Sequence, residues 1–498
     1  KETLETRENL VLHQAEIVSI GLTDGHVSSV TTHTGAVYAV RAVVIATGTY
    51  LGGRTIVGDV VRTSGPDGLA AATELTKCLA DMGLRLRRFK TGTPPRVNAR
   101  SVRFDEMQLQ PGDEEIEPFS YSTDAAALHN RAVCWLTYTK ARTHEIIRAN
   151  LDRSPLFNGT IESTGPRYCP SIETKIVTFP DKERHQLFIE PMGLHTQELY
   201  IQGLSSSLPE DVQIDVVRSI PGLENAEMQR CAYAIEYDCV DPTELRATLE
   251  SKKIPGLYGA GQFNGSSGYE EAAVQGFVAG VNAALKIRGE EPLILRRSDG
   301  YIGTLIDDLV TKGTEEPYRI MTSRSEYRLL HRQDNADERL THIGHRIGLI
   351  SDERLAAVQD KYAAVAKERQ RLEHTHLAPG EAINALLREK GTAEIVSGAS
   401  LADLLRRPQI EYADLLPFDP ERPALPRAVR VSAEVRVRYD GYIRRELAEV
   451  KKLQKLEEKL LPPDVDYAAI GGLRLEARQK LNKIRPRSLG QAMRISGV

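Results

Sequence analysis

Long hydrophobic runs, abundant cysteine and an excess of one charge are all missing from this sequence of 498 residues. No stretch of eighteen or more consecutive apolar residues occurs, so the sequence predicts no membrane-spanning helix. The 5 cysteines are few and lack metal-ligand spacing, which argues against a disulfide framework and against a zinc site. The 65 Lys and Arg residues face 69 Asp and Glu residues, for a net charge of −4. That balance excludes a protein that coats nucleic acid with a basic surface throughout, but it permits a local basic patch.

The composition is that of an ordinary soluble globular protein, with 41% hydrophobic and 27% charged residues. At roughly 100–200 residues per domain, the length suggests about three domains. The sequence contains no internal repeat, no Walker-type phosphate loop and no histidine in a triad-like or metal-like spacing. It begins with Lys1 rather than Met, so we expect the chain to be the interior of a longer gene product.

Hydrophobic periodicity and turn residues predict a strand-rich beginning followed by helices. Strands are expected at Leu10–Leu12, Ile17–Ile20, Val27–Thr32, Val37–Ala46 and 254–261, with hairpin turns at Asp24-Gly25 and Thr34-Gly35. Helices are expected at Leu69–Met82, Glu270–Leu285 and Tyr442–Leu461, and after a Ser351 cap. In the second helix, Gly276 and Gly280 predict a close backbone approach to a sheet. Residues 85–103 lack acidic side chains, and their Gly and Pro residues predict an ordered turn.

Two small-residue turns follow predicted strands, where an α/β sheet lets a cofactor approach the backbone. Thr47-Gly48 ends the first of these strands, and a purely structural turn explains that signal about equally well. Gly259–Glu271 links a short strand to a helix, and its four glycines have no side chains to cover the backbone. The free N–H groups at the start of that helix suit a phosphate or the anionic edge of a reduced flavin. A flexible loop with a capped helix is the alternative.

Cys169 has the most reactive setting among the cysteines. Arg167 and Lys175 lie near it in the sequence, and cationic neighbours lower a thiol pKa and favour the nucleophilic thiolate. Cys169 is therefore a candidate catalytic residue, with a structural cysteine as the open alternative. The remaining cysteines adjoin apolar residues or lack a nearby base, namely Cys78, Cys134, Cys231 and Cys239.

Two basic segments could recognise phosphate groups. The first is a Gly- and Pro-containing stretch that includes Arg88, Lys90 and Arg96. The competing explanation for this first segment is a solvated charged loop, and for the second segment it is pairing with local acids such as Glu326. The second repeats arginine every four residues, which would align the side chains along one helix face, at Arg324, Arg328 and Arg332.

A set of longer motifs runs in order along essentially the whole chain. They are Ile45–Thr49, Lys90–Arg96, Gly165–Glu173, Glu190-Pro191, Ala234–Asp238, Gly259–Ala273, Glu316–Arg319, Ser323–Arg328, Asp334–Asp337 and Ile484–Val498. Together these motifs closely resemble the MnmG/GidA family, the FAD-dependent tRNA uridine 5-carboxymethylaminomethyl modification enzymes. Their joint occurrence is far more specific than any single glycine pattern.

The resemblance implies an α/β fold. In it, an FAD-binding dinucleotide domain of the glutathione-reductase type carries an α+β insertion domain and precedes an all-α C-terminal domain. The implied FAD-binding parts are residues 1–94 and 237–289. The insertion domain, on the NADH and tRNA side, is implied at 95–236, and a helical domain that binds tRNA and a partner GTPase at 290–498.

The resemblance also implies an enzyme of tRNA processing. With an MnmE-family GTPase it would add an aminomethyl or carboxymethylaminomethyl group to C5 of the wobble uridine. FAD and NADH would supply the redox chemistry, methylene-tetrahydrofolate the carbon, and glycine or ammonium the amine. A cytoplasmic homodimer that forms a heterotetramer with the GTPase is implied, with no metal and no membrane attachment.

Carried over position by position, the resemblance assigns roles to individual residues. Cys169 would act as nucleophile or acid–base group on the uracil ring, because C5 is activated when a nucleophile adds at C6. Residues 165–179 match a stretch associated with NAD, and Gln262 matches an FAD-contacting glutamine. The residues implied to bind tRNA are Arg88, Lys90, Arg96, Arg324 and Arg328. Those implied to bind cofactors are Ile17, Thr47, Gly48, Gly165, Pro166, Arg167, Tyr168, Ser171, Ile172, Glu173, Lys175, Gly261, Gln262, Asn264, Gly268, Tyr269 and Glu270.

The sequence departs from the family at both ends. The family begins with a strand, a Gly-rich dinucleotide fingerprint and a helix, and it has a second functional cysteine in a Ser-Cys-Asn-Pro-like loop. This sequence contains neither feature, because it starts near the family's third strand region, and it stops at Val498 where the family continues. Without the pyrophosphate cradle, we expect this chain as written to bind FAD weakly or not at all.

Two other functions stay open at this point. One is a flavin oxidoreductase that acts on a small molecule and shares only the cofactor scaffold. The other is a non-catalytic fragment that binds tRNA and a partner protein, because the cofactor fingerprint is absent. We favour the tRNA-modifying enzyme, with its start truncated.

Overall fold

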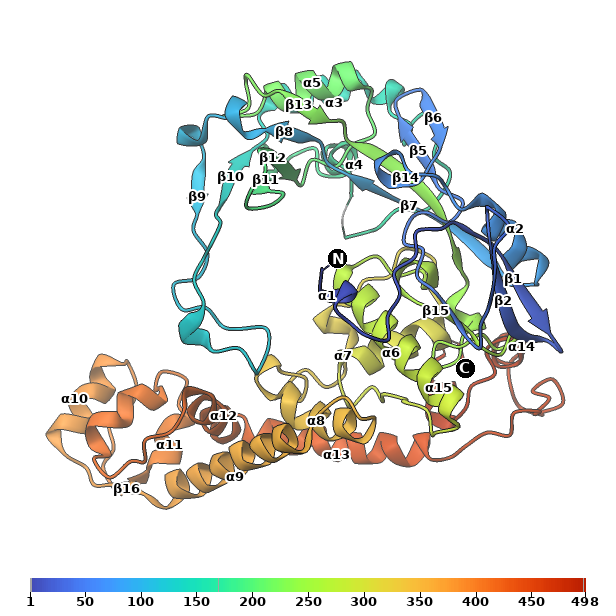
Figure 1. The fold of residues 1–498 in the computed structure, drawn as a ribbon. Coiled ribbons are helices and arrows are strands. Elements are labelled where there is room, and N and C mark those ends of the chain that lie inside the picture. The colour runs from blue at the N-terminus through green and yellow to red at the C-terminus, as the bar shows by residue number, and fades with distance from the viewer. Residues whose placement is uncertain (1, 169, 496) are drawn as a thin grey trace. The chain divides into compact units, whose positions relative to one another are not determined.

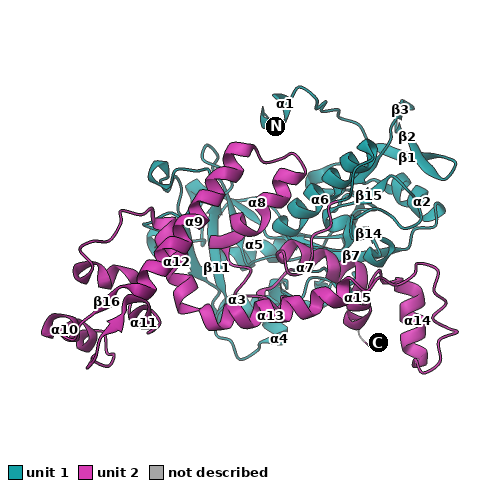
Figure 2. Cartoon of the chain, turned by 90° about the horizontal axis from the view of Figure 1, so that it is seen from below, with its two compact units in different colours: residues 1–292, 312–319 teal, residues 293–311, 320–498 magenta. Residues whose placement is uncertain are grey.

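The computed structural model describes residues 2–168, 170–495 and 497–498 (Figure 1). The chain divides into two compact units, which Figure 2 shows in different colours. Unit 1 contains residues 1–292 and 312–319, and unit 2 contains residues 293–311 and 320–498. The short segment 312–319 thus belongs to unit 1, although the chain on both sides of it belongs to unit 2.

Unit 1 begins with helix α1 (Glu2–Glu5) and an antiparallel meander of β1 (Ile17–Thr23), β2 (His26–Thr32) and β3 (Val37–Ala39). The meander confirms the predicted hairpin turns, and Asp24 and Gly25 adopt φ values of 50° and 78°, as a tight hairpin requires. The predicted strand Leu10–Leu12 is wrong. These residues pair with no strand among those described, and Val11 is 86% exposed.

The predicted strand Val37–Ala46 is in fact two strands with different partners. β3 extends the meander, whereas β4 (Val43–Ile45) pairs in parallel with β15 (Leu257–Gly259), which confirms the predicted strand near 254–261. The register aligns Ile45 with Gly259, so both strands end at the same level. Helix α6 (Tyr269–Arg288) follows β15 and confirms the predicted helix in that region.

Two helices of unit 1 differ in detail from the prediction. Helix α2 (Thr73–Asp81) begins later than expected, because Leu69 is 57% exposed and the buried stripe starts at Leu75. The prediction that Gly276 and Gly280 bring the backbone of α6 close to a sheet is also wrong. A Cβ placed at Gly276 or Gly280 would meet no atom within 4 Å.

A four-stranded antiparallel sheet contains β5 (Arg54–Val57), β6 (Val60–Thr63), β7 (Leu86–Thr93) and β14 (Tyr233–Val240), in the order β6-β5-β14-β7. The predicted turn over residues 85–103 is therefore wrong. Strand β7 pairs with β14 along its whole length, and Pro94-Pro95 separates it from β8 (Arg96–Asn98). Pairing with a strand distant in sequence overrides the local turn preference of Gly92.

A six-stranded antiparallel sheet lies between residues 96 and 230, in the order β13-β8-β12-β11-β10-β9. Ile147, Ile172 and Val216 from three helices pack into its core and are at most 3% exposed. This sheet lies within the predicted insertion domain, whose boundaries stay a prediction. The remaining strands are β9 (Gln108–Gln110), β10 (Cys134–Tyr138), β11 (Gln186–Pro191), β12 (Glu198–Gln202) and β13 (Met228–Arg230), and the helices are α3 (Ala141–Ala149), α4 (Ile172–Thr178) and α5 (Glu210–Arg218).

Unit 2 is helical, as predicted, apart from the two-residue strands β16 (His376–Leu377) and β17 (Ala399–Ser400). Ser351 caps α9 as predicted, by accepting the backbone N–H of Arg354. Helix α13 begins before the predicted Tyr442 and ends before the predicted Leu461. The helices are α7 (Tyr301–Asp307), α8 (Ala336–Arg346), α9 (Asp352–His374), α10 (Glu381–Glu389), α11 (Leu401–Leu405), α12 (Arg427–Arg438), α13 (Asp440–Glu457), α14 (Leu475–Ile484) and α15 (Leu489–Arg494).

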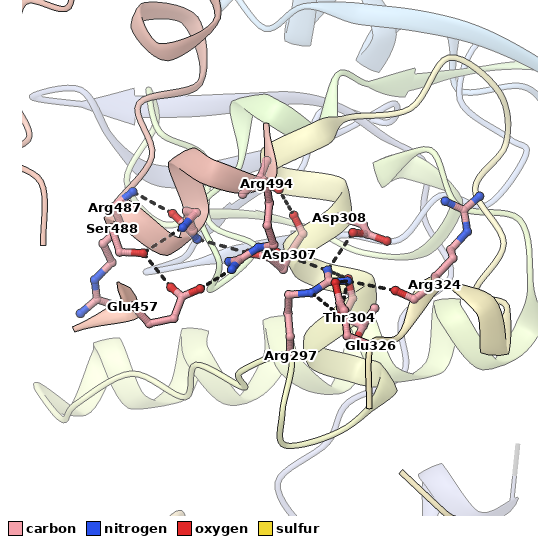
Figure 3. A network of polar contacts seen from close by, with 12 residues as sticks. Arg297, Thr304, Asp307, Asp308, Arg324, Glu326, Glu457, Arg487, Ser488 and Arg494 are labelled. Atoms are coloured by element: carbon pink, nitrogen blue, oxygen red, sulfur yellow. Dashed lines mark hydrogen bonds and ion pairs between the residues drawn. The ribbon is translucent and has the colours of Figure 1, made fainter. Parts of the chain in front are cut away.

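An arginine–carboxylate network ties the end of α15 to the end of α7 within unit 2 (Figure 3). Arg494 Nε and Nη2 donate to the two carboxylate oxygens of Asp307, at 2.8 and 3.0 Å. Arg297, whose side chain is 7% exposed, lies 3.3 Å from Asp307 and 2.8 Å from Asp308. Arg494 also pairs with Glu457 at the end of α13. Every buried charge named here has an opposite charge beside it, as a low-dielectric interior requires.

The predicted helical alignment of arginines in unit 2 is wrong. A 3-10 turn covers Thr322–Arg324, and no helix covers residues 325–332. Glu326, expected as a local partner of these arginines, instead lies 2.9 Å from Arg297. Arg332 pairs with Asp334 at 2.9 Å. The four-residue spacing therefore does not bring the guanidinium groups onto one face.

Candidate functional site

Two loops that the sequence predicts to bind a cofactor lie side by side in unit 1. Thr47-Gly48 follows β4 and Gly261-Gln262 follows β15. Because these strands are parallel neighbours, both loops leave the same edge of the sheet. The N–H of Ala260 donates to the carbonyl of Ile45 at 2.9 Å. A Cβ at Gly48 would lie 3.5 Å from Gln262 Oε1, so the backbone of one loop faces the side chain of the other.

The second loop continues into the start of α6. Gly261 and Gly265 adopt φ values of 67° and 80°, a backbone region in which other residues are strained. Gly268 is the N-cap of α6 and supplies no side-chain cap, so the first N–H groups of the helix stay available to a ligand. Tyr269 and Glu270 of the first turn are exposed.

The loop pair fits the flavin dinucleotide that the family resemblance implies. Thr47 Oγ1 and Asn264 Oδ1 are shielded from solvent, and within the described parts of the chain neither has a hydrogen-bond partner. Buried polar atoms of this kind need a partner. The bare backbone at Gly48 and Gly261 and the start of α6 add donors for an anionic group. Ile17, which the resemblance implies to bind the cofactor, begins β1 and is half-buried, and its role stays a prediction.

Strand β7 connects this loop pair to the segment that contains Cys169. A Cβ at Gly265 would lie 3.3 Å from Cε2 of Phe89. The N–H of the next residue, Lys90, donates to the carbonyl of Thr164 at 3.0 Å. A Cβ at Gly165 would lie 3.0 Å from Lys90 Cδ. Adjacent residues of one strand thus contact both segments that the sequence singled out.

The segment 165–175 has an exposed first part and a buried second part. Arg167 and Tyr168 are exposed, and Pro166 is half-buried. Ser171 caps α4, and Lys175 Nζ donates to the carbonyl of Gly203 at 2.9 Å. The first part therefore offers the accessible surface for a dinucleotide.

Glu173 is a predicted cofactor-binding residue whose side chain is fully buried. Its Oε1 accepts from Ser206 Oγ at 2.9 Å and from the N–H of Ser207 at 3.0 Å. Ile172, also fully buried, packs into the core beside it. Oε1 of Glu173 thus ties α4 to the loop after β12, whereas Oε2 is shielded from solvent and has no hydrogen-bond partner among the described residues. The role of Glu173 in cofactor binding stays a prediction.

Cys169 lies outside the described residues, so its predicted catalytic role stays a prediction. The other cysteines are described. Burial raises the pKa of Cys134, that of Cys231 to about 11 and that of Cys239 to about 12. Cys78 Sγ accepts a backbone hydrogen bond from β1. Thiols with a raised pKa stay protonated near neutral pH and are poor nucleophiles.

The predicted tRNA-binding residues of unit 1 have internal partners. Arg88 Nη1 donates to Asp238 Oδ1 at 2.7 Å, and Arg96 Nη1 to Glu198 Oε1 at 3.1 Å. Lys90 is 7% exposed. A tRNA phosphate would have to compete with these carboxylates for the two guanidinium groups. The tRNA-binding role of this segment stays a prediction.

The predicted tRNA-binding residues of unit 2 are Arg324 and Arg328. Arg328 is exposed and Arg324 is half-buried. The carbonyl of Arg324 accepts from Arg297 Nη2 at 3.0 Å, so its backbone is tied to the buried arginine network. The accessible side chain of Arg328 can therefore contact a phosphate, and its role stays a prediction.

Sequence reasoning missed a buried acid–base cluster on β14. Glu236, whose side chain is 2% exposed, accepts from Arg54 Nε at 2.9 Å and from Ser163 Oγ at 2.6 Å. Burial alone would raise the pKa of Glu236, but the hydrogen bonds from Ser163 and the charge of Arg54 outweigh it and hold this pKa below its ordinary value. Acidic side chains at alternate positions of an apolar strand, Glu236 and Asp238, were the available signal.

A histidine pair, with His144 buried and His185 half-buried, predicts acid sensitivity of unit 1. The rings of His144 and His185 lie 5.4 Å apart, and burial lowers the pKa of both. Below about pH 6.5 the unfolded chain takes up protons that the folded pair resists. The free energy of unfolding should therefore keep the full contribution of this pair above that pH. It should fall on acidification, by up to about 1.4 kcal/mol for each unit by which folding lowers the pKa. Thermal unfolding of wild type and of the H144Q/H185Q variant between pH 7 and 5 checks this, and equal slopes would contradict it.

Comparison with known families accounts for nearly the whole chain. Residues 1–291 match the model described as glucose inhibited division protein A. Residues 352–447 match the C-terminal helical domain of the tRNA modifying enzyme MnmG/GidA, and residues 449–498 match its C-terminal helical bundle. No described helix is both long and apolar enough to cross a membrane, and the described residues contain no cluster of side chains suited to a metal ion.

Curated relatives and solved structures agree with these matches. The tRNA uridine 5-carboxymethylaminomethyl modification enzyme MnmG of Clostridium botulinum strain Loch Maree is 55% identical over all of this chain and 80% of its own length. MnmG of Caldicellulosiruptor saccharolyticus is also 55% identical, over 79% of its length. The form II crystal structure of Aquifex aeolicus GidA superposes with a TM-score of 0.90 at 44% identity, over all of this chain and 79% of that one. A mixed α/β part followed by a helical C-terminal part is common to both, and the chain belongs to the MnmG/GidA family.

Proposed function

We propose that this protein is a tRNA uridine 5-carboxymethylaminomethyl modification enzyme that uses FAD and acts on the wobble uridine. Its curated relatives carry this activity in their names, and the family is FAD-dependent. The observation that carries the proposal is the pair of loops, Thr47-Gly48 and 261–268, at the carboxyl ends of the parallel strands β4 and β15. Such an edge, next to a helix start, is where α/β proteins bind dinucleotides.

In this proposal the two loops hold FAD. Thr47 Oγ1 and Asn264 Oδ1 would gain hydrogen-bond partners that they lack in the described chain, and the first N–H groups of α6 would face an anionic group. The chemistry that FAD supplies when bound is electron transfer, with NADH as the reductant. Arg167 and Tyr168, both exposed, would bind NADH, with the buried Glu173 positioning their segment.

Cys169 would act on the uracil ring as a nucleophile. A thiolate that adds to C6 moves electron density to C5, which can then attack a one-carbon unit derived from methylene-tetrahydrofolate. The C5 proton is then lost and the C–N bond to tetrahydrofolate breaks, which would leave a methylene group on C5. The nitrogen of glycine or ammonium would add to that methylene group, and departure of the thiolate from C6 would restore the ring double bond. Lys175, in the same stretch of sequence, donates from its ammonium group to the carbonyl of Gly203 at 2.9 Å.

Binding partners complete the proposal. The exposed Arg328 of unit 2 would contact tRNA phosphates together with Arg324, and Arg88, Lys90 and Arg96 are the corresponding candidates in unit 1. An MnmE-family GTPase would act with this protein, as a heterotetramer built on a homodimer in the cytoplasm.

The test of the activity is nucleoside analysis of tRNA. Cells that lack the gene should lose the carboxymethylaminomethyl or aminomethyl group at the wobble uridine, and the wild-type gene should restore it. Liquid chromatography with mass spectrometry of digested tRNA measures both. Full modification in the deletion strain would contradict the proposed function.

Salt dependence distinguishes a tRNA enzyme from a small-molecule flavin oxidoreductase. If the protein contacts about four phosphates, its tRNA affinity should fall by on the order of a hundredfold between 50 and 200 mM salt, because bound counterions are released. Filter binding across a salt series measures this slope, and R328A should make it shallower. Absence of any tRNA binding would favour the oxidoreductase instead.

A further inference from the structure

The segment 312–319 covers the loop that we propose to hold FAD. The N–H of Tyr318 donates to the carbonyl of Gly265 at 2.8 Å, and the N–H of Ser267 donates to the carbonyl of Tyr318 at 2.9 Å. These bonds form a short parallel bridge between the segment and the loop. A Cβ at Gly265 would also lie 3.1 Å from Thr314 Cγ2. The loop is therefore packed against residues that follow it by about fifty positions.

A side-chain ion pair joins the same segment to the start of α6. Arg319 Nε donates to Glu271 Oε1 at 3.1 Å, and the Glu271 side chain is 1% exposed. The pair packs directly against Gly268, where an added Cβ would lie 1.8 Å from Glu271 Oε2 and 2.8 Å from Arg319 Nε. Because Gly268 is the N-cap of α6, the ion pair supports the point at which the helix begins.

Gln275 of α6 holds the loop from within the core. Its Oε1 accepts from Asn264 Nδ2 at 2.9 Å, and its Nε2 donates to Ser266 Oγ at 2.8 Å. Ser266 Oγ in turn donates to the carbonyl of Gly261 at 2.9 Å. All of these atoms belong to buried residues. The loop is thus tied to the core by Gln275 and contacts Phe89 of β7, and the 314–319 segment packs against it as well.

We propose that residues 314–319 act as a clamp that keeps the 261–268 loop in the conformation that receives FAD. Arg319 is its positioning residue and acts through Glu271 and Gly268. Without Arg319, the nearly buried Glu271 carboxylate loses a charge partner beside the loop, and a buried charge without its partner is strongly unfavourable. Reorientation of the Glu271 side chain then releases Gly268 and the start of α6. This inference rests on the proposed FAD site.

The experiment titrates FAD into the full-length protein and its R319A variant. If the released loop adopts the binding conformation about a tenth of the time, the apparent Kd for FAD rises about tenfold. Quenching of flavin fluorescence measures the Kd, and visible circular dichroism reports the environment of the bound flavin ring. R319K preserves the positive charge and should recover most of the affinity and the wild-type spectrum.

Lys286 provides the matched control at the other end of the same helix. It is half-exposed, like Arg319, and pairs with the largely buried Glu250, but it lies in the last turn of α6. K286A should therefore leave the FAD Kd and the flavin spectrum unchanged. An unchanged Kd in R319A, or equal losses in R319A and K286A, would overturn the clamp and leave the proposed function standing. A wild-type protein that binds no FAD would instead contradict the proposed function.

Discussion

Replacing Cys169 with serine is expected to abolish modification of the wobble uridine. A serine hydroxyl is far less acidic than a thiol, so the anion that must add to C6 is not populated near neutral pH. We expect the rate of modification to fall on the order of a thousandfold or more, as for other essential nucleophiles. The measurement is nucleoside analysis of tRNA from cells that lack the gene and express C169S at the wild-type level.

The matched controls are serine variants of cysteines that the structure describes. Burial raises the pKa of Cys134 and of Cys231, so neither thiol is activated, and C134S and C231S should leave modification close to wild type. Alkylation by iodoacetamide adds a readout that does not depend on turnover. Cys169 should react at lower pH than the other thiols, because Arg167 and Lys175 are cationic. Wild-type modification by C169S would remove Cys169 from the chemistry and leave the family assignment intact.

The two loops that we propose to hold FAD could be located from the sequence because their signals are local. Gly261 and the turn at Thr47-Gly48 follow short apolar strands, and that pattern alone indicates an edge where a ligand meets the backbone. Which strands pair could not be predicted in the same way. The run Val37–Ala46 looks continuous, yet β3 joins the meander while β4 joins β15, more than 200 residues later. The run divides into two strands because β3 and β4 pair with different strands in the folded protein.

Charge in the basic segments was harder to interpret, because the partners of these side chains are distant in sequence. Arg88 and Asp238 are 150 residues apart, yet they lie 2.7 Å from each other. The absence of acidic residues between 85 and 103 therefore says little about the electrostatic environment of Arg88 and Arg96. In unit 2 the spacing of Arg324, Arg328 and Arg332 suggested a helix, but this stretch is mostly irregular. A periodic charge pattern indicates a helix face only if apolar residues support the helix.

Replacing Glu236 with alanine is expected to be the most destabilising change among the cluster residues of unit 1. The carboxylate is almost fully buried and accepts bonds from Arg54 and from Ser163. Removing one partner of a buried ion pair costs about 3–5 kcal/mol, and the lower end applies here because Arg54 keeps some contact with water. Urea denaturation of the wild type and of E236A measures the loss. E145A is the control, since Glu145 forms a solvent-exposed pair with Arg142 and its loss should cost no more than about 1 kcal/mol.

The position of Glu236 also connects this loss of stability to function. Arg54 Nη2 donates to the carbonyl of Thr160 at 3.0 Å, and Ser163 N donates to Glu236 Oε1 at 3.2 Å, so the cluster fixes the chain just before Gly165. Because the pKa of Glu236 lies below its ordinary value, its stabilisation is present above about pH 4.3 and is lost as the pH falls through the folded-state pKa. E236Q should therefore show a weaker loss of stability between pH 5 and 3 than the wild type. If E236Q instead followed the wild-type acid profile, the Arg54–Glu236–Ser163 cluster would not be what holds the 160–165 segment.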